Sequence, residues 1–356
     1  MSLRDSQGAV FEYPMASEGI NMRKSVVELR PTEALFTQNL TFKDGMTKIR
    51  GYETVTAAEV SAGNKVTGLH RFYNCSGIKK TLVASGTTIK ELNGTAWDTI
   101  DATIGQSQTT NTKTHFYTWG ALSKCYICNG VDRAIAYDGT TAEECGIATY
   151  TVVDYTALGG AVVTLEVDGV TTTLTEAVDW TAATSNTSTA TSLASAIDGI
   201  TGMTGTAVAA VVTATVNLTA HLQDATNLTL SKTPFLPPTA LMVQVYQDRL
   251  LAIDPNNAGT LIWSKSFDDT EWENKSATGV RPDTQLFGMS VHSTSNVDVG
   301  YKAGILLAGA DSMHYFVATD MRTPATTGDY TIYPLATTAG CNAPDTMKWT
   351  PAGTIY

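Results

Sequence analysis

The stretch DRLLAIDPNNAGTLIWSKSFDDTEW, residues 248–272, contains the pattern that decides the fold. A short apolar run at residues 250–253 is followed by a polar turn and a second apolar run at residues 261–263. Apolar runs this short, bounded by turn residues, predict two β-strands joined by a turn. An acidic loop follows and closes at Trp272. The protein is therefore expected to be built from β-hairpins of this kind.

Similar phrases recur along the chain at a nearly regular spacing. They begin at residues 82, 126, 250 and 305 and again near 352. The spacings are 44, 55 and about 47 residues, except for the 124 residues between 126 and 250, which fall to 42 without residues 151–232. A β-unit that repeats every 40–50 residues or so is typical of propeller blades. We expect a mainly β fold, a β-propeller that is incomplete or truncated, because the chain ends in mid-repeat at Tyr356 unless the N-terminal strand closes the ring.

The stretch that interrupts the repeat has a different pattern. Strands are predicted at residues 162–167 and 171–174 around an Asp168-Gly169 turn. A helix over residues 191–198 is predicted to have Ser188 or Thr189 as its cap, and strands are expected at 208–218 and 227–230. This predicts a small inserted α+β domain. The expected domains are thus 1–150 (N-terminal arm and first blades), 151–232 (inserted α+β domain) and 233–356 (remaining blades, truncated at the C-terminus).

Composition excludes several function classes. The net charge is -11 and charged residues make up 16% of the chain, with no Lys/Arg run, which argues against sequence-specific binding of nucleic acid. No apolar stretch of about 18 residues is present, so no membrane span is expected. The N-terminus lacks the apolar core of a signal peptide, and five irregularly spaced cysteines favour a reducing compartment.

Several phrases resemble one known family. They are GI-N at residues 19–21, L-R-P-T-E-A at 29–34, R-G-Y at 50–52, YICNGVDRAIAYDGT at 126–140 and GCNAPDTM at 340–347. This pattern is similar to that of the β-propeller tail proteins of tailed phages and prophages, although Gly19-Ile20 stands where the family has two glycines. The resemblance implies a virion structural protein of the head–tail junction, tail nozzle, stabilisation or hub type, with no catalytic residues to carry over. The stretch at 169–198 resembles small add-on domains of phage tail proteins.

Two motifs have both a chemical and a structural interpretation. Cys125 and Cys128 form a CxxC, but no second ligand pair is visible, and in a strand the two side chains point to opposite faces. We expect buried structural cysteines. Residues 266–272, SFDDTEW, are similar to the Asp-box turn of sialidase-like propellers but lack its Gly, which favours an acidic hairpin loop with Trp272 filling space between blades.

The other candidate groups give weaker support for a functional site. The carboxylates of residues 248, 254, 268, 269 and 271 include the types needed for a glycosidase pair, but sequence cannot place them together. His70 and His115 each precede an aromatic pair and are expected at the same position of successive repeats, which favours a structural role. No catalytic, cofactor-binding or metal site is therefore predicted.

The resulting hypothesis is a non-enzymatic phage or prophage virion protein, made in the bacterial cytoplasm. It would act through contacts with its own copies in a ring and with portal, adaptor or tail proteins, without cofactor or membrane. Two alternatives remain open. One is a carbohydrate-binding or glycan-cleaving propeller, in which tryptophans 97, 119, 263 and 272 stack on sugars. The other is a host-surface adhesin that binds through residues 151–232.

Overall fold

The structure is a computed structural model, and it divides into two compact units, Met1–Ala57 and Ala58–Tyr356. In the first unit it describes only short strands. In the second it describes residues 59–355 except 103, 105–106, 168–169, 217–219, 226–227, 238, 255–259, 273–284, 293–303, 319–329, 337–340, 342–347 and 351–352. The resemblance-bearing phrases at residues 29–32, 50–52 and most of 340–347 lie outside the described residues.

The first unit contains three two-stranded pairings. These strands are β1 (Ser2–Arg4), β2 (Val10–Glu12), β3 (Gly19–Ile20), β4 (Glu33–Ala34), β5 (Leu40–Thr41) and β6 (Thr47–Lys48). β1 pairs with β2 and β5 with β6 in antiparallel fashion, whereas β3 pairs with β4 in parallel.

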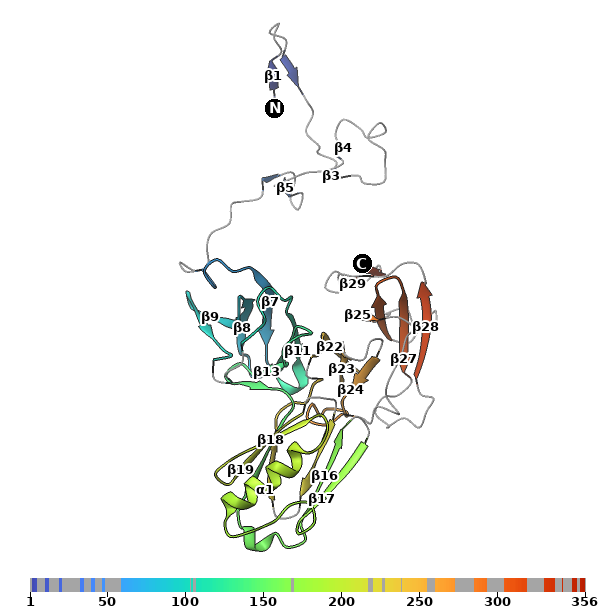
Figure 1. Ribbon diagram of the computed structural model, residues 1–356. Coiled ribbons are helices and arrows are strands. Elements are labelled where there is room, and N and C mark those ends of the chain that lie inside the picture. Colours follow the sequence, from blue (N-terminus) through green and yellow to red (C-terminus); the bar gives the residue numbers. More distant parts are fainter. Residues whose placement is uncertain are drawn as a thin grey trace. The chain divides into compact units, whose positions relative to one another are not determined.

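Most of the second unit consists of antiparallel meanders, in which each strand pairs with the next in sequence (Figure 1). The first meander has β7 (Val66–Tyr73), β8 (Lys79–Ser85), β9 (Thr88–Asn93) and β10 (Ala96–Thr99). The second has β11 (His115–Trp119), a short 3-10 turn η2 (Gly120–Leu122), β12 (Lys124–Cys128), β13 (Ile135–Tyr137) and β14 (Ala142–Glu144). The strands predicted at residues 82 and 126 are confirmed.

Two further meanders follow later in the chain. The third has β22 (Met242–Tyr246), β23 (Arg249–Asp254) and β24 (Thr260–Trp263). The fourth has β25 (Leu286–His292), β26 (Gly304–Gly309), β27 (Met313–Ala318) and β28 (Tyr330–Ala336). A last hairpin is formed by β29 (Lys348–Thr350) and β30 (Gly353–Ile355). The protein is thus mainly β, as expected, with several small antiparallel sheets.

The elements between the second and third meanders form what we call the module, residues 147–232. It contains β15 (Ile147–Val152), η3 (Tyr155–Ala157), β16 (Val162–Val167), β17 (Val170–Thr175), α1 (Asn186–Asp198), β18 (Met203–Val208), β19 (Val211–Val216), β20 (Ala220–Ala225) and β21 (Leu228–Lys232). One sheet has the order β18-β19-β15-β21, and α1 contacts its first three strands; the other has the order β17-β16-β20 (Figure 1).

Local predictions for the module were partly right. The hairpin at β16 and β17 is confirmed, although its Asp168-Gly169 turn lies outside the described residues. The helix begins earlier than predicted, and its cap is Ser185, whose hydroxyl accepts from the Ser188 N–H, rather than Ser188 or Thr189. The strand expected at 208–218 is confirmed as β19, which begins at Val211 because Ala209, at φ 53°, lies in a turn that pairs β19 with the unpredicted strand β18.

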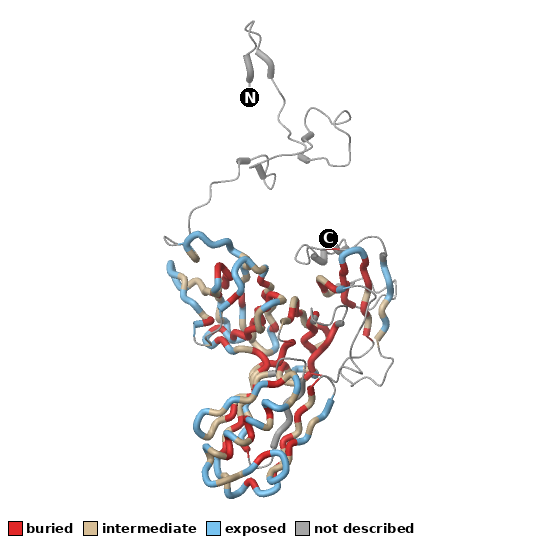
Figure 2. The backbone as a smooth tube through the Cα atoms, in the orientation of Figure 1, coloured by how far each residue is buried: buried red, intermediate tan, exposed pale blue. Residues whose placement is uncertain are grey.

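Burial on both faces of the central strands explains their nearly continuous apolar sequence. In β12, Cys125 and Ile127 join a core with the first meander, while Tyr126 and Cys128 join a core with the module and third meander. The third and fourth meanders share another core, which contains Trp263. Figure 2 shows this buried material concentrated along the central strands.

Candidate functional site

The first strands of successive meanders lie next to one another. β7 contacts β11, β11 contacts β22, β22 contacts β25, and β25 contacts β29. None of these neighbours pairs in a common sheet among the described strands, so the contact is made by side chains and by close backbone approach. We call this row of five strands the seam. β11 and β22 adjoin in it although the whole module separates them in sequence.

Polar side chains connect the first two links of the seam. His70 Nε2 on β7 lies 2.8 Å from Thr118 Oγ1 on β11, and the His70 ring stacks on Phe116. His115 Nε2 lies 3.2 Å from the Val243 carbonyl oxygen on β22. Burial, and to a smaller extent His115, lower the pKa of His70 below its ordinary value. The neutral imidazole is therefore favoured at the seam.

The link between β11 and β22 has a second contact of this kind, and the link between β22 and β25 has another. Burial raises the pKa of Tyr117, against a smaller opposing effect from a hydrogen bond with the Val245 backbone on β22. The Gln244 amide, in the orientation that satisfies both of its ends, donates to Met289 O at 3.2 Å and accepts from Val291 N at 3.0 Å on β25. Side chains of one first strand thus bond the next first strand repeatedly.

A second cluster surrounds the two chain crossings that join the module to the meanders. Gly146 N–H donates to Pro234 O at 2.8 Å, and Ile147 N–H donates to Thr233 Oγ1 at 3.0 Å. The entering and leaving strands are therefore adjacent. We call residues 145–147 and 232–235 the neck.

The neck lies against a buried ionic group that joins the second and third meanders. Asp269 Oδ2 accepts from Lys124 Nζ and from the Tyr126 hydroxyl, each at 2.8 Å. Asp269 is buried, and its carbonyl oxygen accepts from Phe235 N–H at 2.6 Å. Burial, and then Asp269, raise the pKa of Tyr126, so the phenol stays protonated and donates. A buried carboxylate is stabilised only when it is paired in this way.

The rest of the loop at 264–272 closes over the neck. Glu271 forms ion pairs with Lys232 at 3.1 Å and with Lys265. The indole N–H of Trp272 donates to Phe235 O, and the Trp272 side chain is fully buried. Asp268 accepts from the N–H and hydroxyl of Thr270. The predicted acidic hairpin loop and the burial of Trp272 are confirmed, and the position of Trp272 between blades stays a prediction.

The prediction that Cys125 and Cys128 are buried and point to opposite faces of a strand is confirmed. Cys125 and Cys128 are both buried, and they lie in different cores on opposite faces of β12. Burial raises the pKa of the Cys125 thiol to about 12. A thiol held protonated in this way is a poor nucleophile and a poor metal ligand.

Among the candidate carboxylates whose side chains the structure describes, no recorded contact joins two of them as a facing pair. Asp268, Asp269 and Glu271 are each engaged by the loop or neck groups described above. Asp248 lies in the turn between β22 and β23, where its carbonyl accepts from Phe267 N–H, and the Asp254 side chain lies outside the described residues. The chemistry of a two-carboxylate glycosidase has no visible geometry in the described part of the chain.

The histidine prediction needs a correction. His70 lies opposite Leu82 in its meander, whereas His115 lies opposite Cys128. Because Leu82 and Tyr126 begin equivalent phrases, the residue equivalent to His70 is Tyr117, two residues after His115. The two histidines therefore occupy different positions along the first strands of their meanders, although both form contacts between neighbouring strands of the seam.

Three of the four tryptophans proposed for sugar stacking are buried. Trp119, Trp263 and Trp272 are each at most 4% exposed, and only Trp97, on β10, is partly exposed. A buried indole offers no face to a sugar ring, so three of the four tryptophans proposed for sugar stacking cannot serve in that way.

Sequence reasoning missed Lys124 and Tyr126 as partners of Asp269, and it missed Gln244. The only available signal was a polar residue inside an otherwise apolar run, as in KCYIC, which does not specify a partner 145 residues away.

Comparisons with known proteins add little. No family model matches the chain, and no curated protein matches it. Among solved structures, the computationally designed Ika8 protein is 11% identical, covering 78% of this chain and 90% of its own, with a TM-score of 0.17. A likeness this low carries no argument. In the part of the chain that the structure describes, no helix is both long and apolar enough to cross a membrane.

Proposed function

We propose that this chain is a non-enzymatic structural protein of a phage or prophage virion, at the tail or head–tail junction. In this proposal its meanders are blades of a propeller around a common axis, and the module is a domain inserted between the second and third blades. The domains are residues 1–150, 151–232 and 233–356, with the module's first strand beginning at Ile147 rather than after residue 150.

The seam is the observation that supports the proposal that the meanders are propeller blades. When sheets are arranged radially, their innermost strands come together at the axis, and in a meander that strand is an end strand. Here it is the first strand every time, from β7 to β29. The close approach is helped by Gly68, where an added Cβ would lie 2.6 Å from Thr114 O on the next meander's side.

The virion part is supported by the family-like phrases in the sequence and by the absence of a facing catalytic constellation in the described residues. The two polar clusters both serve joins between sheets: the seam groups bond neighbouring first strands, and Asp269 bonds the second meander to the third. Such groups make a rigid building block. In a ring of copies around the DNA path, the net charge of -11 would repel DNA and let it slide.

Particles released from the bacterium that carries this gene test the proposal. Phage or induced prophage particles are purified on a density gradient, and the chain is quantified in them by mass spectrometry against the major capsid protein. We expect a few copies per particle, sedimenting with the tail fraction after heads and tails are separated. Recovery of the chain only in the particle-free lysate would overturn the proposal.

A further inference from the structure

Two exposed surfaces of opposite charge are left unused by the fold. The first is the outward face of the first meander, which we call the basic face. Its strand residues are Leu69, Arg71, Tyr73, Lys79, Thr81, Val83, Lys90, Leu92, Trp97 and Thr99. Val83 is buried and Lys90 donates to the Val60 carbonyl oxygen, so the exposed part of the face is the part along β7 and the start of β8. Alternation along these strands puts Glu91 and Asp98 on the other face, which packs on the second meander. Its strand residues thus include two exposed cations, Arg71 and Lys79, and no carboxylate, in a chain of net charge -11.

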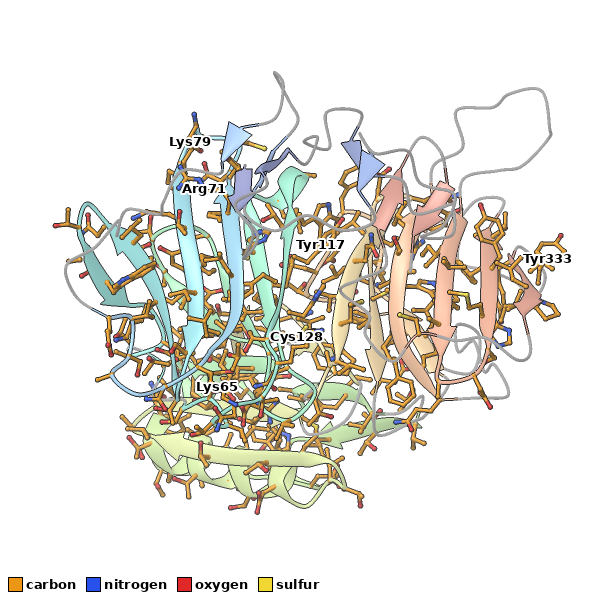
Figure 3. The ribbon with its side chains drawn as sticks, turned by 90° about the horizontal axis from the view of Figure 1, so that it is seen from above. Lys65, Arg71, Lys79, Tyr117, Cys128 and Tyr333 are labelled. Atoms are coloured by element: carbon orange, nitrogen blue, oxygen red, sulfur yellow. The ribbon has the colours of Figure 1, made fainter. Side chains whose placement is uncertain are left out.

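The edge of the basic face along β7 is exposed and partly apolar. Leu69 is 69% exposed and Tyr73 is 51% exposed. Arg71 lies over the Tyr73 ring at 5.6 Å and donates to Thr81 Oγ1, and Lys79 pairs across the strands with Tyr73. Figure 3 shows Arg71 and Lys79 next to each other at this end of the sheet. The Arg71–Tyr73 contact holds the guanidinium in place before any partner arrives.

The second surface is the end of the module farthest from the neck, which we call the tip. It comprises Val153, Asp154, Glu176, Val178 and Asp179. β15 starts at the neck and ends at Val152, whereas β16 starts at Val162 and its partner β17 ends at Thr175. The segments that follow β15, precede β16 and follow β17 therefore lie together at the end of the module opposite the neck. Val153 is 66% exposed and Val178 is 79% exposed. Figure 2 shows this end of the module largely exposed.

The tip carboxylates accept local hydrogen bonds. Glu176 accepts from Gly160 N–H at 3.0 Å and Ala182 N–H at 3.2 Å, and these bonds lower its pKa. Asp154 accepts from the hydroxyl and N–H of Thr156, which lowers its pKa as well. Asp179 accepts from Thr175 N–H at 2.7 Å. The module has seven carboxylates and one Lys or Arg, Lys232, which is at the neck, so no Lys or Arg of the module offsets the charge of the tip.

We propose that the tip of one copy docks on the basic face of a second copy, in a head-to-tail contact. Each surface combines exposed apolar side chains with charges of one sign, and the signs are opposite. Leu69 and Val178 are exposed among the described residues of the second unit, and the opposite charges of the two surfaces favour a contact between copies. It is heterologous and leads to a ring or an open row of copies. The inference rests on the proposed function, because it names the surfaces through which the subunits contact each other.

The test uses sedimentation velocity of the full chain over a range of concentrations at low and high salt. We expect association that strengthens with concentration and weakens with salt, because exposed charges are screened. The variant R71E/K79E reverses the basic face and raises the dissociation constant at least about tenfold. The matched control R71K/K79R keeps both charges and associates like the original chain.

A mixing experiment tests the head-to-tail geometry. V153K/V178K spoils the tip, and R71E/K79E spoils the basic face, so each variant alone stays monomeric. Mixed in equal amounts, they form dimers and nothing larger, because only one intact contact remains. All variants are first shown to unfold at the midpoint of the original chain, which separates lost docking from lost folding.

Two results overturn the inference: a chain that stays monomeric at low salt and high concentration, or variants that associate as the original does. Either result leaves the proposed function standing if the chain is still found in particles. Absence from particles together with charge-dependent association would overturn the proposed function instead.

Discussion

Lys124 Nζ lies 2.8 Å from Asp269 Oδ2, although 145 residues separate the two in sequence. The pair joins the second meander to the loop after the third, across the neck of the module. The Tyr126 hydroxyl completes the set of donors to the same oxygen. This contact therefore reports whether the two meanders and the neck are assembled together.

Replacing Asp269 with Ala should lower the free energy of unfolding by about 3 kcal/mol, because Lys124 and Tyr126 lose their acceptor in a buried setting. The Lys124 side chain keeps 26% of its exposure, so water relieves part of the cost. Urea unfolding measures the change. Lys265→Met is the control: it removes a more exposed partner of Glu271 and should cost less than about 1 kcal/mol. Equal effects of the two changes would contradict the assigned role of Asp269.

Gly205 on β18 sits directly against the backbone of α1. A Cβ there would overlap the Ala194 carbonyl oxygen and lie 3.1 Å from Asp198 N. Gly205→Ala should therefore destabilise the chain by about 2 to 3 kcal/mol, since backbone cannot move aside as a flexible side chain can. Gly159→Ala, in the same module but with open space around its Cβ, is the matched control. Thermal unfolding followed by far-UV circular dichroism compares the two.

The stability of the seam should depend on pH through His70. Its pKa is lowered in the folded state, so between that lowered value and the ordinary 6.5 the unfolded chain binds more protons. The contribution of His70 is thus fully present above pH 6.5 and is lost as the pH falls below it. We expect the urea midpoint to drop between pH 7 and the onset of carboxylate titration, and to drop less in His70→Gln. An identical pH profile for both chains would exclude His70 as the source.

Thiol accessibility should distinguish Cys75 from the other cysteines. Cys75 is exposed, whereas Cys125, Cys128, Cys145 and Cys341 are buried. Burial also raises the pKa of Cys145 well above its ordinary value. In a native chain, a chromogenic disulfide reagent should modify one thiol quickly and the others only on unfolding. Cys75→Ser should remove the fast phase; a fast phase that survives would mean that a core opens.

The sequence alone determined that the protein is mainly β, where the second strand of each of the four meanders lies, and that residues near 151–232 differ from the rest. These follow from local rules, since alternation, short apolar runs and turn residues act over a few positions. It also placed Cys125 and Cys128 on opposite faces, because strand geometry fixes the direction of each side chain. The helix cap at Ser185 and the β18–β19 hairpin were missed, since several Ser, Thr and Ala residues fit those positions locally.

Only the tertiary structure decided which distant groups meet. The bond between His70 and Thr118, the side-by-side first strands, and the Lys124–Asp269 pair all depend on sheets approaching from far apart in sequence. Polar residues in an apolar strand show that a partner is needed, because burial without one is costly, but they do not identify it. The partner is fixed only when packing of the sheets brings the two side chains within hydrogen-bonding distance.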